Sequence, residues 1–83
     1  MDSMPSYFFD FKIEDAVAID DEGVELSDTG AAHDHAVSTL AAAFSDVVLE
    51  GATQQRLVIG VRDEMGPVLE ISAVFDSKIL RTQ

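Results

Sequence analysis

Residues Gln55 to Phe75 read Q-R-L-V-I-G-V-R-D-E-M-G-P-V-L-E-I-S-A-V-F, which is two apolar runs on either side of a short polar stretch. In that stretch, Asp63 can bond the backbone ahead of it, and Gly66 tolerates the left-handed conformation that a tight turn with a bulge requires. The pattern predicts a β-hairpin, and we expect the rest of the chain to cover one of its faces.

Side chains alternate between the two faces of a strand, so every second residue of the hairpin shares a face. One face is apolar throughout and is the expected core side. The other face is mixed, because two arginines and a glutamate interrupt its valines. The core face carries Leu57, Ile59, Val61, Leu69, Ile71, Ala73 and Phe75.

The first part of the chain contains two further strand signals. Residues 7–13 alternate with period 2 and predict a strand whose aromatic side chains point into the core. Asp20-Asp21-Glu22-Gly23 repeats the D-x-x-G spacing of the hairpin and predicts a second turn. Residues 24–26 can then form a short strand beside the first, and the remainder of residues 14–29 is expected to be irregular.

A helix is predicted from about Gly30 to Leu49, with N-cap candidates at Ser27-Asp28-Thr29. Its apolar positions follow a 3.6-residue period and should form the face that covers the hairpin. The small residues 41–43 favour a helix and should allow a close approach to the sheet. The apolar positions are Ala36, Val37, Leu40, Phe44, Val47 and Val48.

These elements predict an α+β fold, a small antiparallel-rich sheet in the order β-β-α-β-β with one helix packed on one face. A chain of 83 residues is expected to be one domain. We expect residues 1–5 to be an N-terminal extension, residues 6–76 to be the domain and residues 77–83 to be a C-terminal tail.

The formal net charge is −11, and it is unevenly distributed. Residues 1–50 hold 12 of the 16 acidic residues and one base, whereas residues 51–83 hold four acids and four bases. Direct nucleic-acid binding is disfavoured, because phosphate contacts need clustered Lys and Arg. An acidic surface can instead meet a basic protein partner, including by mimicry of nucleic acid. The candidate acidic patch for this is Asp20, Asp21, Glu22 and Glu25.

Composition also bounds the setting of the protein. The chain has no cysteine, which excludes disulfides and thiolate chemistry. It contains no run of 18 apolar residues, so no membrane-spanning helix is expected. The opening Met1-Asp2-Ser3-Met4 lacks the basic and apolar regions of a signal peptide. The expected location is therefore the cytoplasm.

His33-Asp34-His35 is the one stretch that resembles a chemical site. On a helix, residues i and i+2 point about 200° apart, so the two imidazoles cannot share a metal ion from this helix alone. His33 is expected at the boundary of the apolar stripe and His35 in solvent. A nucleophile–base pair with Ser38 would also need an orienting group and oxyanion donors, and the sequence shows neither.

A calcium-binding loop around Gly23 does not fit either. If Gly23 is the sixth loop position, the first and twelfth positions are Ala18 and Thr29, which supply no carboxylate. A weak, irregular cation site near Asp20 and Glu22 stays open as an alternative. We therefore predict no cofactor, no metal site and no catalytic residue, and we expect that the protein is not an enzyme.

The opening Met4-Pro5-Ser6-Tyr7-Phe8-Phe9-Asp10 resembles the M-P-x-Y-F-F-D start of a family of short, acidic bacterial proteins of unknown function. The D-x-x-G-x-E-L-x-D pattern at residues 20–28, an alanine-rich helix and the V-x-D-x-x-G hairpin at residues 61–66 follow in that family's order. The resemblance covers nearly the whole chain, although His33 stands where the pattern often has an arginine. It supports the architecture and implies no activity.

One helix covers one face of the sheet, so the opposite face should be open. Several apolar side chains on such a face indicate an interface. Our leading hypothesis is a non-enzymatic interaction module that self-associates, as a dimer, through the open face or an edge strand. The alternative is the acidic regulator described above. The candidate interface residues are Phe8, Val58, Val68 and Val74.

Overall fold

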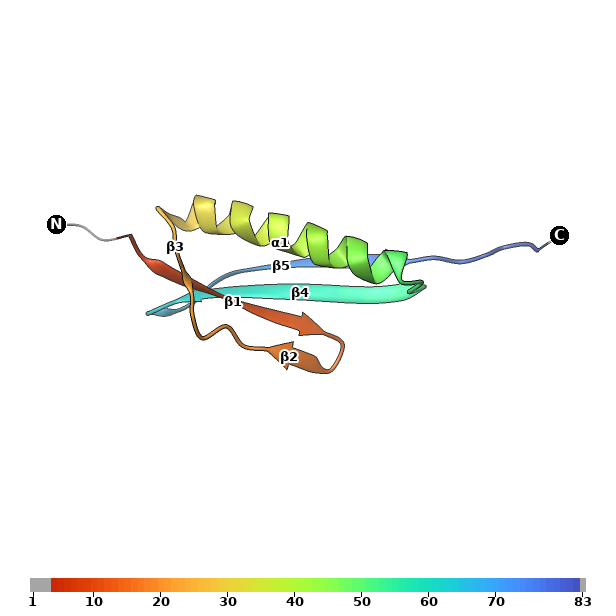
Figure 1. Cartoon of the computed structure of the whole chain (residues 1–83), viewed down its shortest axis with the longest axis horizontal. Helices are drawn as coiled ribbons and strands as arrows, with labels where there is room; N and C mark the ends of the chain where they lie inside the picture. Colours follow the sequence, from red (N-terminus) through yellow and green to blue (C-terminus); the bar gives the residue numbers. More distant parts are fainter. Residues whose placement is uncertain (1–3, 83) are drawn as a thin grey trace.

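The computed structural model describes residues 4–82, in which one helix lies across one antiparallel sheet (Figure 1). The α+β class is confirmed, although the sheet has one strand more than predicted. Residues 1–3 of the predicted N-terminal extension lie outside the described residues. The elements are β1 (Ser6–Ile13), β2 (Ala16–Ala18), β3 (Val24–Glu25), α1 (Thr29–Leu49), β4 (Gln54–Asp63) and β5 (Gly66–Asp76).

The predicted hairpin is formed by β4 and β5. Asp63 pairs with Gly66, and the Asp63 carboxylate accepts a hydrogen bond from the backbone N–H of Met65 at 2.8 Å. Gly66 has a φ of 121°, which is the positive value that favours glycine. A register shift after Val61 adds one residue to β5, so the side chains near the turn do not follow a simple alternation.

The additional strand is β2. The sequence predicted irregular structure, and no strand, for residues 14–18. Ile13 pairs with Ala16, so Glu14 and Asp15 alone form the connecting loop. Glu14 has a φ of 51°, a left-handed conformation that is uncommon for a residue other than glycine. The turn therefore carries no glycine signal, which is why the sequence pattern missed it.

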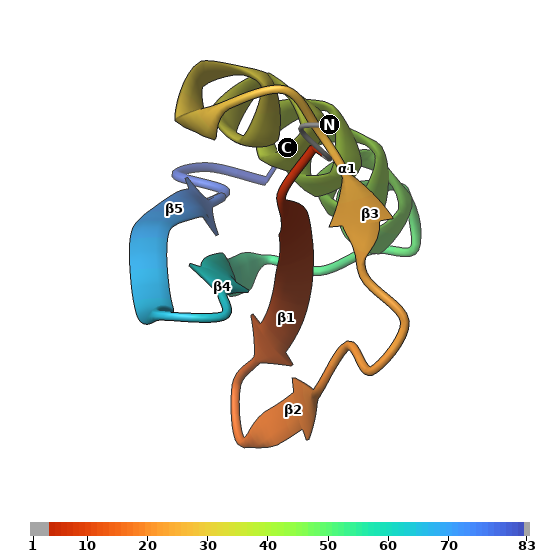
Figure 2. The same ribbon diagram turned by 90° about the vertical axis from the view of Figure 1, so that its left-hand side faces the viewer.

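The sheet order is β2-β1-β4-β5, with β3 also paired to β1. One edge of β1 pairs with β4, and its other edge pairs with β3 near the start and with β2 near the end. Figure 2 shows β5 at the side of the sheet opposite to β2 and β3. In the described part of the chain, β5 has β4 as its one strand neighbour.

Helix α1 begins where predicted, because the Asp28 side chain caps it by accepting the N–H of Ala31 at 2.9 Å. One detail of the predicted face was wrong, because Val37 is exposed. Of the small residues, Ala32 and Ala36 are buried and Ala43 packs against the core, whereas residues 41 and 42 are exposed. The buried stripe therefore begins nearer to the N-terminus than the alanine run.

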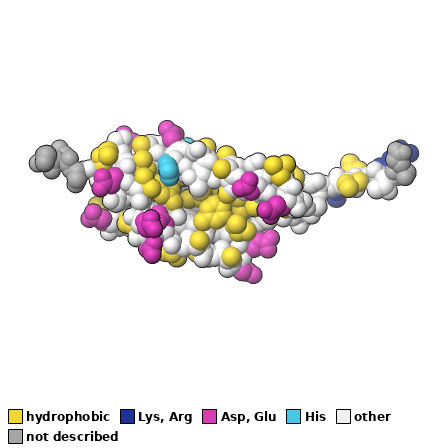
Figure 3. All heavy atoms as spheres, in the orientation of Figure 1, with side chains coloured by type: hydrophobic (Ala, Val, Ile, Leu, Met, Phe, Trp, Pro, Cys, Tyr) yellow, Lys and Arg dark blue, Asp and Glu magenta, His cyan; other side chains and the backbone are white. Residues whose placement is uncertain are grey.

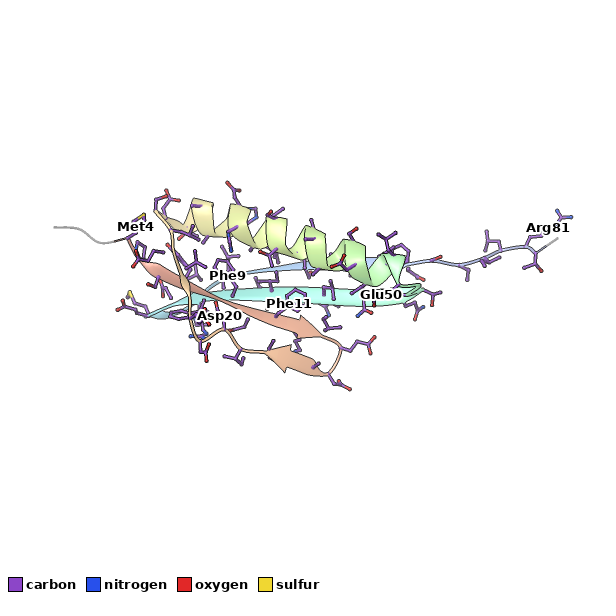
Figure 4. All side chains as sticks on the ribbon, in the orientation of Figure 1. Met4, Phe9, Phe11, Asp20, Glu50 and Arg81 are labelled. Carbon is purple, nitrogen blue, oxygen red and sulfur yellow. The ribbon has the colours of Figure 1, made fainter. Side chains whose placement is uncertain are left out.

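The core lies between α1 and the sheet and is thin. Among the described residues, seven apolar residues are buried, and they come from β1, α1 and β4. Phe9, Phe11 and Phe44 pack against them but stay half-buried. Figure 4 shows Phe9 and Phe11 between β1 and α1, and Figure 3 shows apolar surface on this side of the molecule. The buried residues are Tyr7, Ala32, Ala36, Leu40, Leu57, Ile59 and Val61.

Candidate interaction site

The sheet face away from α1, here called the open face, is organised by Arg62. The Arg62 guanidinium donates to the Asp10 carboxylate at 2.9 Å and to the Asp20 backbone carbonyl at 2.7 Å. Its carbon Cζ lies 4.7 Å from the centre of the Phe8 ring, which is a cation–π contact. Register explains the arrangement, because Phe8 on β1 lies directly opposite Arg62 on β4.

Asp20 joins the loop before β3 to β1 through its own carboxylate. The two oxygens accept hydrogen bonds from the backbone N–H groups of Phe9, Glu22 and Gly23. The Asp20 N–H in turn donates to Asp10 at 3.0 Å. The turn predicted at residues 20–23 is confirmed, and Gly23 has the positive φ of 77° that it requires.

These contacts change the acidity of both carboxyl groups. The hydrogen bond from Arg62 holds the pKa of Asp10 below its ordinary value, against the opposing effect of partial burial. The hydrogen bond from the Phe9 N–H likewise holds the pKa of Asp20 below its ordinary value. The N–H groups of Glu22 and Gly23 lower it further. Both groups therefore stabilise the fold as carboxylates.

The candidate acidic patch consequently divides into two parts. The Asp20 carboxylate is engaged in holding the loop, so it is not available to a partner. Asp21, Glu22 and Glu25 have exposed side chains around the same turn. Three carboxylates of the proposed four thus remain free to meet a basic group.

The four candidate interface residues are in different surroundings. The Phe8 ring is covered by Arg62 and also lies close to Gly23, where an added Cβ would be 2.9 Å from the ring. Val68 is the extra residue at the bulge; it packs against the core cluster and also lines, with Asp10 and Arg62, a hollow on the open face. Val58 is half-buried, and Val74 is 70% exposed.

The open face is also more polar than its valines indicated. Cross-strand register sets Val17, Lys12, Val58 and Ser72 in one row, and Arg56 beside Val74 in the next. Gly60 leaves a gap in the face, and a hollow of about 430 Å³ extends from there toward the β4–β5 turn. Its polar lining comes from Asp10, Arg62 and Glu70.

The two histidines of α1 are in different surroundings. His33 Nδ1 is 3.5 Å from the carboxylate of its neighbour Asp34, and both side chains are largely exposed. The His35 ring packs against Phe9 with their centres 4.7 Å apart, so His35 and not His33 contacts the sheet. Within residues 4–82, no group of three or more His, Asp or Glu side chains is placed to hold a metal ion.

The described residues contain no helix long and apolar enough to cross a membrane. A protein-family model described as a domain of unknown function (DUF6894) matches residues 6–74. The chain belongs to the DUF6894 family. No match was found among curated proteins or among solved structures.

The DUF6894 match covers every helix and strand but stops two residues before β5 ends. Beyond it lies a segment, residues 77–82, that leaves the body of the molecule in an extended conformation (Figure 4). A short polar stretch with two aliphatic residues carries no periodic signal, so the sequence predicts a tail without a defined role. The structure places it in line with the free edge of the sheet.

Proposed function

We propose that this DUF6894 chain is a non-enzymatic interaction module that self-associates through the free edge of β5. The supporting observation is the edge itself. β5 is 11 residues long and pairs with β4 on one side, while its other side meets no strand within the described residues. An unpaired edge presents a row of backbone donors and acceptors to any extended chain.

The direction of these backbone groups follows from one hydrogen bond. The Ser77 N–H donates to the Thr53 carbonyl at 2.7 Å, so residue 77 faces the β4 side of the ladder. Backbone groups point alternately to the two sides of a strand. Ser72, Val74 and Asp76 therefore direct their N–H and C=O groups toward the free edge.

The edge has little of the protection that such strands usually carry. Proteins guard exposed edges with lysines, prolines or bulges. In β5 the bulge and Pro67 lie at the end next to the turn, and Glu70 is the one charged residue between them and Asp76. The part from Ile71 to Phe75 is free of charge and proline, so a partner strand can approach it.

A second copy of the chain is the partner that fits this edge best. A strand that pairs with its own copy in antiparallel fashion forms a two-fold interface from one surface, which is the commonest symmetry of homo-oligomers. β5 carries two of the 16 acidic residues, Glu70 and Asp76, so most of the charge that would repel a second copy lies on other parts of the chain. The open face is a weaker candidate, because Arg62 covers the Phe8 ring, and Lys12 and Arg56 lie beside Val58 and Val74.

The test is sedimentation velocity of the wild type and two matched variants at high micromolar concentration. Val74→Asp places a charge on the β5 edge, whereas Val17→Asp places the same charge on β2, on the same face and at a comparable exposure of 54%. We expect a dimer for the wild type and for Val17→Asp, and a monomer for Val74→Asp. A monomeric wild type contradicts the proposal, and disruption by both variants points to the open face instead.

The exposed carboxylates of Asp21, Glu22 and Glu25 support a second candidate, an acidic regulator that binds a basic protein. Neutralising all three to Asn and Gln should abolish such binding and leave self-association intact. Histone-like or polylysine probes in a fluorescence titration would measure this. Unchanged binding in the neutralised variant would remove the acidic turn from consideration.

The surroundings of the side chains that could act in catalysis support a non-enzymatic protein. His35 is engaged with the Phe9 ring, and His33 lies beside Asp34 on the exposed surface of α1. Ser38 is exposed on the same helix. A hydrolase or transferase activity that is lost on substituting His33 or His35 would contradict this part.

A further inference from the structure

The segment from Ser77 to Thr82 continues the line of β5 away from the body (Figure 1). Ile79 and Leu80 are 79% and 86% exposed, which is unusual for two adjacent aliphatic residues. After the Ser77 N–H, no further backbone hydrogen bond joins this segment to the rest of the described chain. It therefore has both apolar side chains and backbone groups that lack a partner.

The charge of this segment is opposite to that of the body. All 16 acidic residues lie within residues 1–76, whereas residues 77–83 contain Lys78 and Arg81 and no acid. Figure 3 shows carboxylates spread over the body and cationic side chains at the extended C-terminal end. A second copy of this chain thus offers a surface that is complementary in charge to the segment.

We propose that residues 77–82 of one copy add as a strand to the free β5 edge of a second copy, and that the exchange is reciprocal. This inference rests on the proposed self-association and specifies its geometry. The strands are antiparallel, and the two-fold axis passes through Val74, which lies opposite Val74 of the other copy. β5 and the segment then form one continuous edge-to-edge ladder.

Side-chain pairing selects this register. With Val74 at the centre, Lys78 lies opposite Glu70 of the second copy, and Ile79 lies opposite Leu69. Opposite charges directly across antiparallel strands stabilise the pairing, and like charges weaken it. A register centred one residue earlier, on Ala73, would instead set Glu70 against Asp76.

The backbone agrees with the same register. Val74, Ser72 and Asp76 direct their N–H and C=O groups outward, as the Ser77–Thr53 hydrogen bond shows. Continuing the alternation, Lys78 also faces the free side and can exchange hydrogen bonds with Glu70. The ladder ends at Pro67, which has no N–H to donate. Ile79 joins the side of the sheet that α1 covers, where Leu69 is already half-buried against the core.

The first test is a charge exchange measured by sedimentation equilibrium. Lys78→Glu and Glu70→Lys each put like charges opposite one another, so each should weaken the dimer about tenfold, and the double variant should restore it. Glu70→Lys is decisive, because it lowers the net negative charge and would strengthen association if net charge alone mattered. Lys12→Glu, on β1, controls for the charge change in Lys78→Glu and should have a smaller effect.

The second test uses the absence of cysteine from the natural chain. In the Glu70→Cys/Lys78→Cys variant, the two positions of one copy are about 26 Å apart along an extended strand, so no disulfide can form within a copy. Opposite residues of a hydrogen-bonded pair are about 5.5 Å apart, which a disulfide can bridge. Oxidised glutathione should therefore give covalent dimers, and it should also do so for Val74→Cys alone.

The outcomes separate this inference from the proposed function. A dimeric wild type with no cross-link at either site, and with Glu70→Lys strengthening association, would overturn the exchange of C-terminal segments and leave self-association standing. A cross-link in Ile71→Cys but not in Val74→Cys would place the axis at the middle of β5 and also overturn it. A monomeric wild type would remove both proposals.

Discussion

Arg62 Nε lies 2.9 Å from Asp10 Oδ2, and this contact joins two residues that are 52 positions apart in the sequence. The same guanidinium reaches the Asp20 carbonyl and the Phe8 ring. One side chain thus fixes the loop before β3 against the sheet. Arg62 is therefore a structural residue of the open face, and its substitution should affect stability before it affects any interaction.

Arg62→Met should lower the free energy of unfolding by about 1–2 kcal/mol, because it removes charge-assisted hydrogen bonds and the cation–π contact from a partly exposed site. Arg56→Met is the matched control, since Arg56 is exposed on the same strand and face. It should change stability by less than about 0.5 kcal/mol. Urea denaturation followed by circular dichroism measures both, and equal effects would contradict the assigned role.

The pH dependence of stability should carry the signature of Asp10 and Asp20. Both pKa values are lower in the folded chain than the ordinary value of 3.8. Their stabilisation is thus fully present above about pH 4 to 5 and is lost as the pH falls through the folded pKa values. The difference in unfolding free energy between wild type and Asp20→Asn should be constant from about pH 7 to pH 5 and should shrink at lower pH. A difference that persists undiminished at about pH 2 would contradict this assignment.

Gly23→Ala should destabilise the fold through two effects. The backbone at Gly23 has a positive φ of 77°, and an added Cβ would lie 2.9 Å from the Phe8 ring. Gly51→Ala separates the backbone effect from the contact with Phe8, because Gly51 also has a positive φ but has open space where the Cβ would go. We expect a loss of about 1 kcal/mol for Gly51→Ala and about 2–3 kcal/mol for Gly23→Ala. Thermal unfolding with equal losses would show that the Phe8 contact has no energetic weight.

Added salt should distinguish the two candidate functions. Two copies with a net charge of −11 repel one another, so raising NaCl from about 20 mM to about 300 mM should strengthen self-association by screening that repulsion. Binding of a basic partner to Asp21, Glu22 and Glu25 should weaken over the same range. Sedimentation and fluorescence titration in the same buffers measure the two trends. Self-association that weakens steeply with salt would contradict an interface built on backbone pairing.

The sequence predicted the hairpin, the helix and the turn at residues 20–23 because each has a local signal. Alternation placed Leu57, Ile59 and Val61 in the core, and they are fully buried. Asp28 was among the three N-cap candidates and is the residue that caps α1. These features depend on a few neighbouring residues, so periodicity and turn chemistry are sufficient to find them.

The features that the sequence did not predict depend on long-range contacts or on exceptions to the local patterns of turns and strands. β2 follows a loop in which Glu14 takes a conformation typical of glycine. The bulge after Val61 puts Val68 in contact with the core cluster, a contact that strict alternation did not predict. The role of Asp20 depends on Phe9 and, through Asp10, on Arg62, which no local pattern relates. The candidate interface shifted for the same reason, since Phe8 is covered by residues far from it in the sequence.

The side of the sheet opposite to β5 ends in β2 and β3, which pair with β1 at residues 11–13 and 6–7 and are three and two residues long. Such short strands offer few backbone groups to another chain. Once two copies have joined through β5, a third copy meets only these short borders, which disfavours growth into filaments. The short strands before the helix thereby act as a terminator of assembly.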